Sequence, residues 1–236
     1  MTTRRWGWLL ALWALLMLGG CVKLDQTLTL NADGSGTLAM RYGMSEQTIA
    51  QMRAMEQMAA QGGEGLSVKQ ENPLRFDPDQ LRAELDKHRS AGVEVRALSS
   101  EVVDGWQYID LEVAFVDIRA LKRTELFKDS GLAIAPVGQG NYRVTQPGGG
   151  TAAPAGDAAA QQLFRQMPAM LAGLRIVQTI VAPGNIIETN AQRVDGRRAS
   201  WVFDIAEDPG VLDRLAQTRM ELTFDGDGVT LPTVSP

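Results

Sequence analysis

The sequence VKLDQTLTLNADGSGTLAMRY, residues 22–42, specifies the first element of the fold. Leu24, Gln26, Leu28 and Leu30 alternate with polar residues, a period of two that is typical of a half-buried β-strand. Residues 31–36 are rich in turn formers, and the alternation resumes after them. The stretch therefore predicts a β-hairpin, two antiparallel strands joined by a short turn.

The residues before this hairpin have the form of a bacterial lipoprotein signal. Arg4 and Arg5 precede an apolar run that begins at Trp6, and the run ends in Leu18-Gly19-Gly20-Cys21. In such signals the leucine fills a hydrophobic peptidase pocket, the glycines allow close backbone approach, and the cysteine thiol accepts a diacylglycerol group. We expect residues 1–20 to be a cleaved signal peptide, which leaves Cys21 as the acylated first residue.

A membrane-spanning helix is the alternative for the apolar run. From Trp6 to Gly20 it has 15 residues, whereas a spanning helix needs about 20. Cys21 is also the only cysteine of the chain, so it cannot form an internal disulfide, and acylation explains why it is there. The predicted partner is therefore a membrane, held through acylated Cys21. Val22 after the cysteine permits transfer to the outer membrane of a two-membrane bacterium; otherwise the protein belongs on the outer face of the plasma membrane.

The charge of the chain excludes some partners. Its 236 residues carry a formal net charge of −5, and both arginines of the first 20 residues leave with the signal. An acidic body argues against nucleic acid as a partner, and against simple electrostatic adhesion to anionic lipid.

Strand pairs alternate with helices along the rest of the chain. This order predicts an α+β fold, in which an antiparallel sheet built from β-hairpins alternates with helices packed on one face. The expected helices are capped by Ser45, Asp117 and Asp157, or begin near Asp77 and Pro209. The expected strands cover residues 93–98, 108–115, 132–136, 141–145, 174–181, 186–190, 200–205 and 220–224.

A low-complexity segment divides the chain. Residues 146–157 are rich in Gly, Pro and Ala and predict a flexible loop. It separates a first part of the body, residues 21–145, from a second part, residues 158–236. We expect both parts to belong to the same domain, since the length suits one moderately large domain.

Several short motifs resemble the LppM-domain lipoproteins. They are Cys21 followed by Val22-Lys23-Leu24-Asp25, Asp33-Gly34-Ser35-Gly36, Ala182-Pro183-Gly184-Asn185, Glu188-Thr189-Asn190, Gly196 and Trp201. The resemblance covers residues 21–43 and about 174–205. It implies a location in the cell envelope and contact with amphiphilic lipids or glycolipids. It implies no catalytic residues.

Catalytic and metal-binding patterns are weak in this sequence. His88 is the only histidine, and the sequence has no G-x-S-x-G nucleophile elbow. We therefore expect His88 to be a helix-surface or boundary residue, and we expect the protein not to be an enzyme. With the cysteine acylated, zinc lacks ligands. Asp225-Gly226-Asp227-Gly228 resembles part of a calcium loop, but the ligand set is incomplete, and a plain turn is the simpler interpretation. No cofactor is expected.

Methionine is unusually frequent on two predicted helices. These flexible side chains either fill an ordinary core or line an apolar groove for acyl chains. The candidate groove residues are Met44, Met52, Met55, Met58, Met167 and Met170. Two functions follow as hypotheses. One is an envelope module that binds a lipid, glycolipid or other envelope component; the other is a module for protein–protein interaction or scaffolding.

Overall fold

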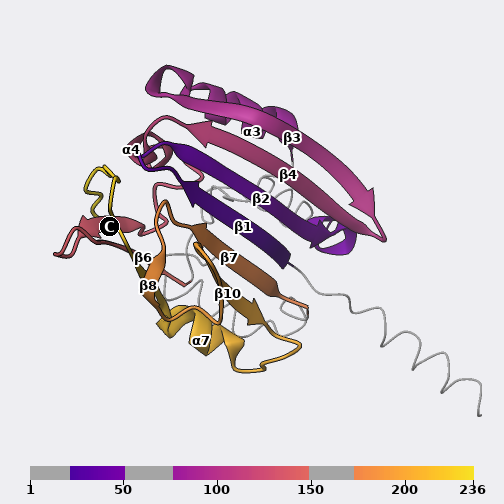
Figure 1. The fold of residues 1–236 in the computed structure, drawn as a ribbon. Helices are drawn as coiled ribbons and strands as arrows, with labels where there is room; N and C mark the ends of the chain where they lie inside the picture. Colours follow the sequence, from indigo (N-terminus) through magenta and orange to yellow (C-terminus); the bar gives the residue numbers. More distant parts are fainter. Residues whose placement is uncertain (1–21, 51–76, 149–172) are drawn as a thin grey trace, which may run out of the picture.

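A computed structural model describes residues 22–50, 77–148 and 173–236 (Figure 1). Within these residues the protein is mostly β-sheet. A seven-stranded sheet has the order β3-β4-β2-β1-β7-β10-β9, and a four-stranded sheet has the order β5-β6-β11-β8. The strands are β1 (Val22–Leu30), β2 (Gly36–Ser45), β3 (Val93–Val103), β4 (Trp106–Phe115), β5 (Ala133–Pro136), β6 (Tyr142–Pro147), β7 (Arg175–Val181), β8 (Ile186–Thr189), β9 (Arg193–Asp195), β10 (Arg198–Asp204) and β11 (Arg219–Phe224).

The predicted hairpin forms the centre of the larger sheet. β1 and β2 pair antiparallel from Val22 opposite Met44 to Leu30 opposite Gly36. On its other side, β1 pairs parallel with β7, with Leu24 opposite Ile176. The larger sheet is therefore mixed, because one parallel pair joins two antiparallel parts.

Turn chemistry explains where the strands reverse. Between β3 and β4, Asp104 and Gly105 have φ values of 51° and 75°, which are the two left-handed positions of a type I′ turn. Between β1 and β2, the Asp33 side chain accepts hydrogen bonds from the Ser35 backbone N–H at 3.0 Å and from the Ser35 hydroxyl at 2.6 Å. Both hairpins predicted from these turns are confirmed.

The larger sheet has one apolar face and one polar face. On β1, Leu24 and Leu28 are each 1% exposed, whereas the residues between them are half-buried or exposed. The other central strands alternate in the same way. The apolar face carries Leu38, Met40, Tyr42, Ile109, Leu111, Val113, Ile176, Ile180, Trp201 and Phe203, all buried. The polar face carries charged and hydroxyl side chains from the same strands.

The α+β prediction, with helices packed on one face of a single antiparallel sheet, is wrong. The described helices are short, and a second sheet contributes to the core instead. They are α3 (Pro78–Asp86), α4 (Ile118–Leu121), α7 (Val211–Gln217), the 3-10 turn η1 (Arg89–Ala91) and the helical residues 46–50. One hydrophobic cluster contains residues of both sheets. Where one helix was expected from about residue 77 to 91, α3 ends at Asp86 and the 3-10 turn η1 follows, before Val93 enters β3 opposite Phe115.

Side-chain caps begin the helices at Asp77, Asp117 and Ser45, whereas the predicted cap Asp157 lies outside the described residues. The Asp77 carboxyl accepts from the backbone N–H groups of Asp79 and Gln80, and that of Asp117 accepts from Arg119. Ser45 Oγ accepts from the backbone N–H of Thr48 at 3.3 Å. The capping residues thus fix where helices begin, as expected for side chains that satisfy free N–H groups.

The C-terminal segment ties the two sheets together. Val234 and Ile134 of β5 exchange two backbone hydrogen bonds of 2.9 Å, and Thr230 N–H donates to the carbonyl of Ala32 at 2.7 Å. Leu231 is 7% exposed. The segment after β11 therefore reaches the β1–β2 turn of the larger sheet and the edge strand of the smaller one.

Gly184 is a position where a side chain does not fit. A Cβ at this residue would lie 1.8 Å from the carbonyl oxygen of Asp225, and the backbone at residues 185 and 225 is hydrogen-bonded at 2.9 Å. We expect Gly184→Ala to lower the free energy of unfolding by about 1–3 kcal/mol, measured by urea denaturation. Gly210→Ala is the control, because its Cβ would meet only the flexible Asp208 side chain at 3.3 Å. Equal effects of the two substitutions would contradict the close approach.

Within the described ranges, no helix is both long enough and apolar enough to span a bilayer.

Candidate functional site

The structure places some of the predicted site residues and leaves others outside its description. Met44 is on β2, 5% exposed, and faces the apolar side of the larger sheet. Cys21 lies outside the described residues, as do the other groove candidates, Met52, Met55, Met58, Met167 and Met170. Lipidation at Cys21 and the methionine groove therefore remain predictions.

The residues considered for catalysis or metal binding occupy ordinary structural positions. His88 precedes η1, half-buried, and its carbonyl accepts from the Ala91 backbone N–H. In the Asp225–Gly228 segment, Asp225 Oδ1 accepts from the Asp227 backbone N–H at 3.0 Å, which is a local turn contact. Among residues 22–50, 77–148 and 173–236, no group of three potential ligands could hold a metal ion.

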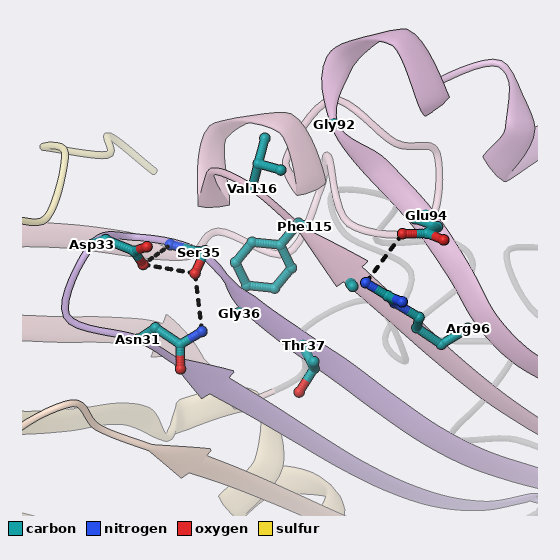
Figure 2. Close-up of a pocket in the computed structure, with 11 residues that line it drawn as sticks. Asn31, Asp33, Ser35, Gly36, Thr37, Gly92, Glu94, Arg96, Phe115 and Val116 are labelled. Atoms are coloured by element: carbon teal, nitrogen blue, oxygen red, sulfur yellow. Dashed lines mark hydrogen bonds and ion pairs between the residues drawn. The ribbon is translucent and has the colours of Figure 1, made fainter.

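A depression of about 430 Å³ lies where the β1–β2 turn meets the start of β3 (Figure 2). Asn31, Asp33 and Ser35 form one side, and an ion pair of 3.2 Å between Glu94 and Arg96 forms the other. Phe115 lies between the two sides. The ring is 3% exposed, so it forms a floor and offers little surface for stacking. The depression can accept hydrogen bonds from a polar group.

Hydrogen bonds stabilise the ionised form of the Asp33 carboxyl in this depression. The Ser35 hydroxyl, followed by the Ser35 backbone N–H, lowers the pKa of Asp33 below its ordinary value of 3.8. Both hydrogen bonds favour the ionised form. Their contribution to folding is present above the unfolded-state pKa and is lost as the pH falls through the lowered folded-state pKa.

We expect Ser35→Ala to raise the pKa of Asp33 toward 3.8, because the largest cause of the lowering is the hydroxyl. A carbon-13 NMR titration of the carboxyl groups measures this directly. Thr37→Ala is the control, since Thr37 lines the same depression without a hydrogen bond to Asp33. An unchanged Asp33 pKa in Ser35→Ala would contradict the assigned cause.

A second depression, of about 340 Å³, lies on the polar face of the larger sheet. Arg41 crosses it and makes ion pairs of 2.6 Å with Asp110 on β4 and with Glu101 on β3. These carboxylates raise the pKa of the Arg41 guanidinium. All three side chains are more than a third exposed, so these ion pairs contribute little to stability. They place charged groups on this face, and the charge of Arg41 is paired with carboxylates of the same face.

Cations and aromatic rings meet at one end of this polar face. Lys23 Nζ lies 4.1 Å from the ring centre of Trp106, and the Arg41 guanidinium lies 4.4 Å from that of Tyr108. The two rings stack with centroids 6.2 Å apart. Gly43 provides the space, because a Cβ there would lie 2.4 Å from the Tyr108 ring. Lys23 is thereby oriented by partners far away in the sequence.

The sequence predicts the Asp104-Gly105 turn but not this cluster, nor the exposed apolar residues beside the turn. Val102 and Val103, just before the Asp104-Gly105 turn, are 58% and 43% exposed. The available signal was two consecutive valines and a tryptophan around a turn, where polar residues are the rule. A group of apolar side chains exposed to water at one place needs a physical explanation.

The residues that carried the family resemblance have structural roles. Trp201, 1% exposed, donates from Nε1 to Asn190 Oδ1 at 3.0 Å, and the same oxygen accepts from the Glu221 backbone N–H. Gly184 permits the approach of the Asp225 backbone, and Gly196 has a φ of 57°. Turns and the contact between the sheets therefore depend on these motif residues.

Comparison with solved structures finds a likeness at the level of the fold. The NMR structure of the folded domain of LppM from Mycobacterium tuberculosis is similar over 90% of this chain and 95% of that chain, with a TM-score of 0.41 and 12% sequence identity. No family model matches the sequence, and no curated protein matches it. The likeness to the LppM domain is a weak one at the level of the fold.

Proposed function

We propose that this protein is a lipoprotein of the bacterial envelope, anchored through acylated Cys21 and without enzymatic activity, that binds a lipid, a glycolipid or another envelope component. The lipobox-like Leu18–Cys21 sequence supports the anchor. β1 begins at Val22, the next residue, so no linker separates the anchor from the folded body. The body would therefore lie against the membrane, either the outer membrane or the outer face of the plasma membrane.

The pairing of β1 with β2 supports the proposal that the protein binds a lipid. Val22 lies opposite Met44 on the neighbouring strand, so Met44 lies at the level where the anchor would leave the body. The chain continues from Met44 into the helical residues 46–50 and then toward the other methionine positions. Methionine side chains suit varied acyl chains because they are unbranched and polarizable. A lipid of the anchoring membrane would have only a short distance to travel to reach Met44.

Photo-crosslinking from methionine tests the binding of a lipid. The protein is produced in its host with a diazirine analogue of methionine, irradiated in the intact membrane, and digested for mass spectrometry. We expect lipid adducts on peptides that contain Met44, Met52, Met55, Met58, Met167 or Met170. Met220, 1% exposed on β11 of the smaller sheet, is the internal control. Adducts only to protein side chains at all of these positions would contradict the proposal of an acyl-chain groove.

Protein–protein interaction is the second candidate, and β3 favours it. β3 is an edge of the larger sheet among the described strands, and its residues 99–103 are all exposed. An exposed edge can add a strand from another protein. If this edge binds a partner in the envelope, Ser100→Pro should remove a chemical cross-link that the unchanged protein forms, while Ser200→Ala on β10 should leave it. A cross-link that survives Ser100→Pro would exclude this edge.

A further inference from the structure

We propose that the turn between β3 and β4, residues 102–106, is a second membrane contact, which inserts its apolar side chains into the interface of the bilayer that holds Cys21. This inference rests on the proposed function, because it takes the acylated Cys21 as the point where the chain meets the membrane. It adds a site that fixes how the body is oriented on that membrane. The turn and the first residue of β1 lie at the same end of the larger sheet (Figure 1).

The sheet register gives the distances. Val22 lies opposite Met44, Met44 opposite Gln107, and Gln107 opposite Val102, so these four residues form one row across β1, β2, β4 and β3. Neighbouring strands are about 4.8 Å apart, which places Val102 about 14 Å from Val22 along the row. The turn at Asp104-Gly105 extends two residues beyond the row, about 7 Å at the usual rise per residue. Val22 in this row follows Cys21 directly in the chain, so a bilayer that holds Cys21 would reach the turn.

The side chains at this turn suit the membrane interface. Val102 and Val103 are 58% and 43% exposed, although valine is usually buried. Trp106 pairs with Val103 across the two strands, half-buried, and stacks on Tyr108. Tryptophan and tyrosine are enriched at membrane interfaces because an apolar ring is combined with a polar group.

Lys23 links the turn to the anchor. Its ammonium group lies over the Trp106 ring at 4.1 Å, and its donation to the Tyr108 hydroxyl, at 3.5 Å, is long. A lysine in this position can keep its charge at the headgroups while its methylene chain lies along apolar surface. Asp104 in the turn carries the opposite charge. The contact therefore depends on apolar insertion, and it does not require an anionic lipid.

Tryptophan fluorescence can test this contact without a label. Of the five tryptophans, three lie at positions 6, 8 and 13, inside the predicted signal, so the processed chain keeps only Trp106 and Trp201. Trp201 is 1% exposed and out of reach of lipid. The protein is purified from its host membrane, its intact mass is measured, and it is reconstituted in zwitterionic vesicles whose lipids carry bromine atoms near the headgroups or near the bilayer centre.

We expect bromines near the headgroups to quench the fluorescence about twofold more strongly than bromines near the centre, and Trp106→Phe to remove this quenching. Val103→Asp should reduce the quenching by about half or more, because a charge at this place opposes insertion. Val137→Asp is the matched control, since Val137 is 41% exposed in the β5–β6 turn, which belongs to the smaller sheet.

The two readouts separate the inference from the proposed function. An acylated chain whose Trp106 is not quenched by either lipid would overturn the membrane contact and leave the lipoprotein assignment intact. A chain that retains residues 1–20 with an unmodified Cys21 would overturn the proposed function, and the inference with it. Quenching that is equally sensitive to Val103→Asp and Val137→Asp would also overturn the assignment to this turn.

Discussion

Cys21→Ser is expected to abolish acylation of this protein completely. Serine has nearly the same size, but its hydroxyl is a far weaker nucleophile than a thiolate, so the thioether to diacylglycerol cannot form. Because Cys21 is the only cysteine, no other thiol can substitute. Growth of the host with an alkyne analogue of palmitate, followed by intact-mass measurement, should show a labelled chain that begins at residue 21. In Cys21→Ser we expect an unlabelled chain that keeps residues 1–20.

A second thiol elsewhere provides the control. Ser99 is exposed on β3, so Cys21→Ser combined with Ser99→Cys restores a free thiol without the preceding Leu18-Gly19-Gly20. This double variant should remain unlabelled, which shows that the label depends on the position of the cysteine and not on its presence. A label that persists in Cys21→Ser alone would refute the lipoprotein assignment.

The local elements of this fold are predictable from sequence because their causes are local. Asp104-Gly105 predicts a hairpin since both turn residues need a positive φ, and the observed values are 51° and 75°. Asp117 predicts the start of α4 since its carboxylate can accept from a free helical N–H, and the Arg119 N–H lies 2.7 Å away. Such signals depend on residues two or three positions apart.

The arrangement of these elements depends on contacts that no local pattern contains. β1 and β7 are neighbours in parallel, with Leu28 opposite Ile180, although about 150 residues separate them. Alternation predicts which residues of each strand are buried, but it does not select the partner strand. The existence of a second sheet follows from pairings such as Leu222 opposite Val144. The α+β prediction was therefore wrong about the layers while most of the strands were correct.

The sequence predicts which residues could make up the candidate site, but not where they lie in the fold. The methionines and Cys21 are visible in the sequence, but only the register shows that Met44 lies opposite Val22. The alternation along β1 predicts that Lys23 lies on a polar face, but it predicts no partner for Lys23 and no role for Trp106. Their contact brings together residues 83 positions apart in the chain, which period-two patterns cannot predict.

Trp201→Ala is expected to lower the free energy of unfolding by about 3–5 kcal/mol, because a large buried side chain would leave a cavity. Trp201 is 1% exposed on the apolar face of the larger sheet, and its Nε1–H donates to Asn190 at 3.0 Å. Asn190 follows β8 and also donates to the Arg219 carbonyl at 2.7 Å, so the pair joins the larger sheet to β11 of the smaller one. Urea denaturation followed by circular dichroism measures the loss.

Four further variants isolate this connection. Asn190→Ala should cost about 1–2 kcal/mol, because it leaves the indole N–H without its acceptor. Trp201→Phe is made alone and combined with Asn190→Ala, and the combined cost should be less than the sum of these two single costs by about 1 kcal/mol, because residues that share a hydrogen bond are coupled. Trp106→Ala is the matched control for residue type, and at a half-buried position it should change stability by no more than about 1 kcal/mol. If Trp201→Ala lowered stability as little as Trp106→Ala, the two sheets could not share the core that the structure describes. If the costs of Trp201→Phe and Asn190→Ala were strictly additive, only the hydrogen bond between these two residues would be refuted.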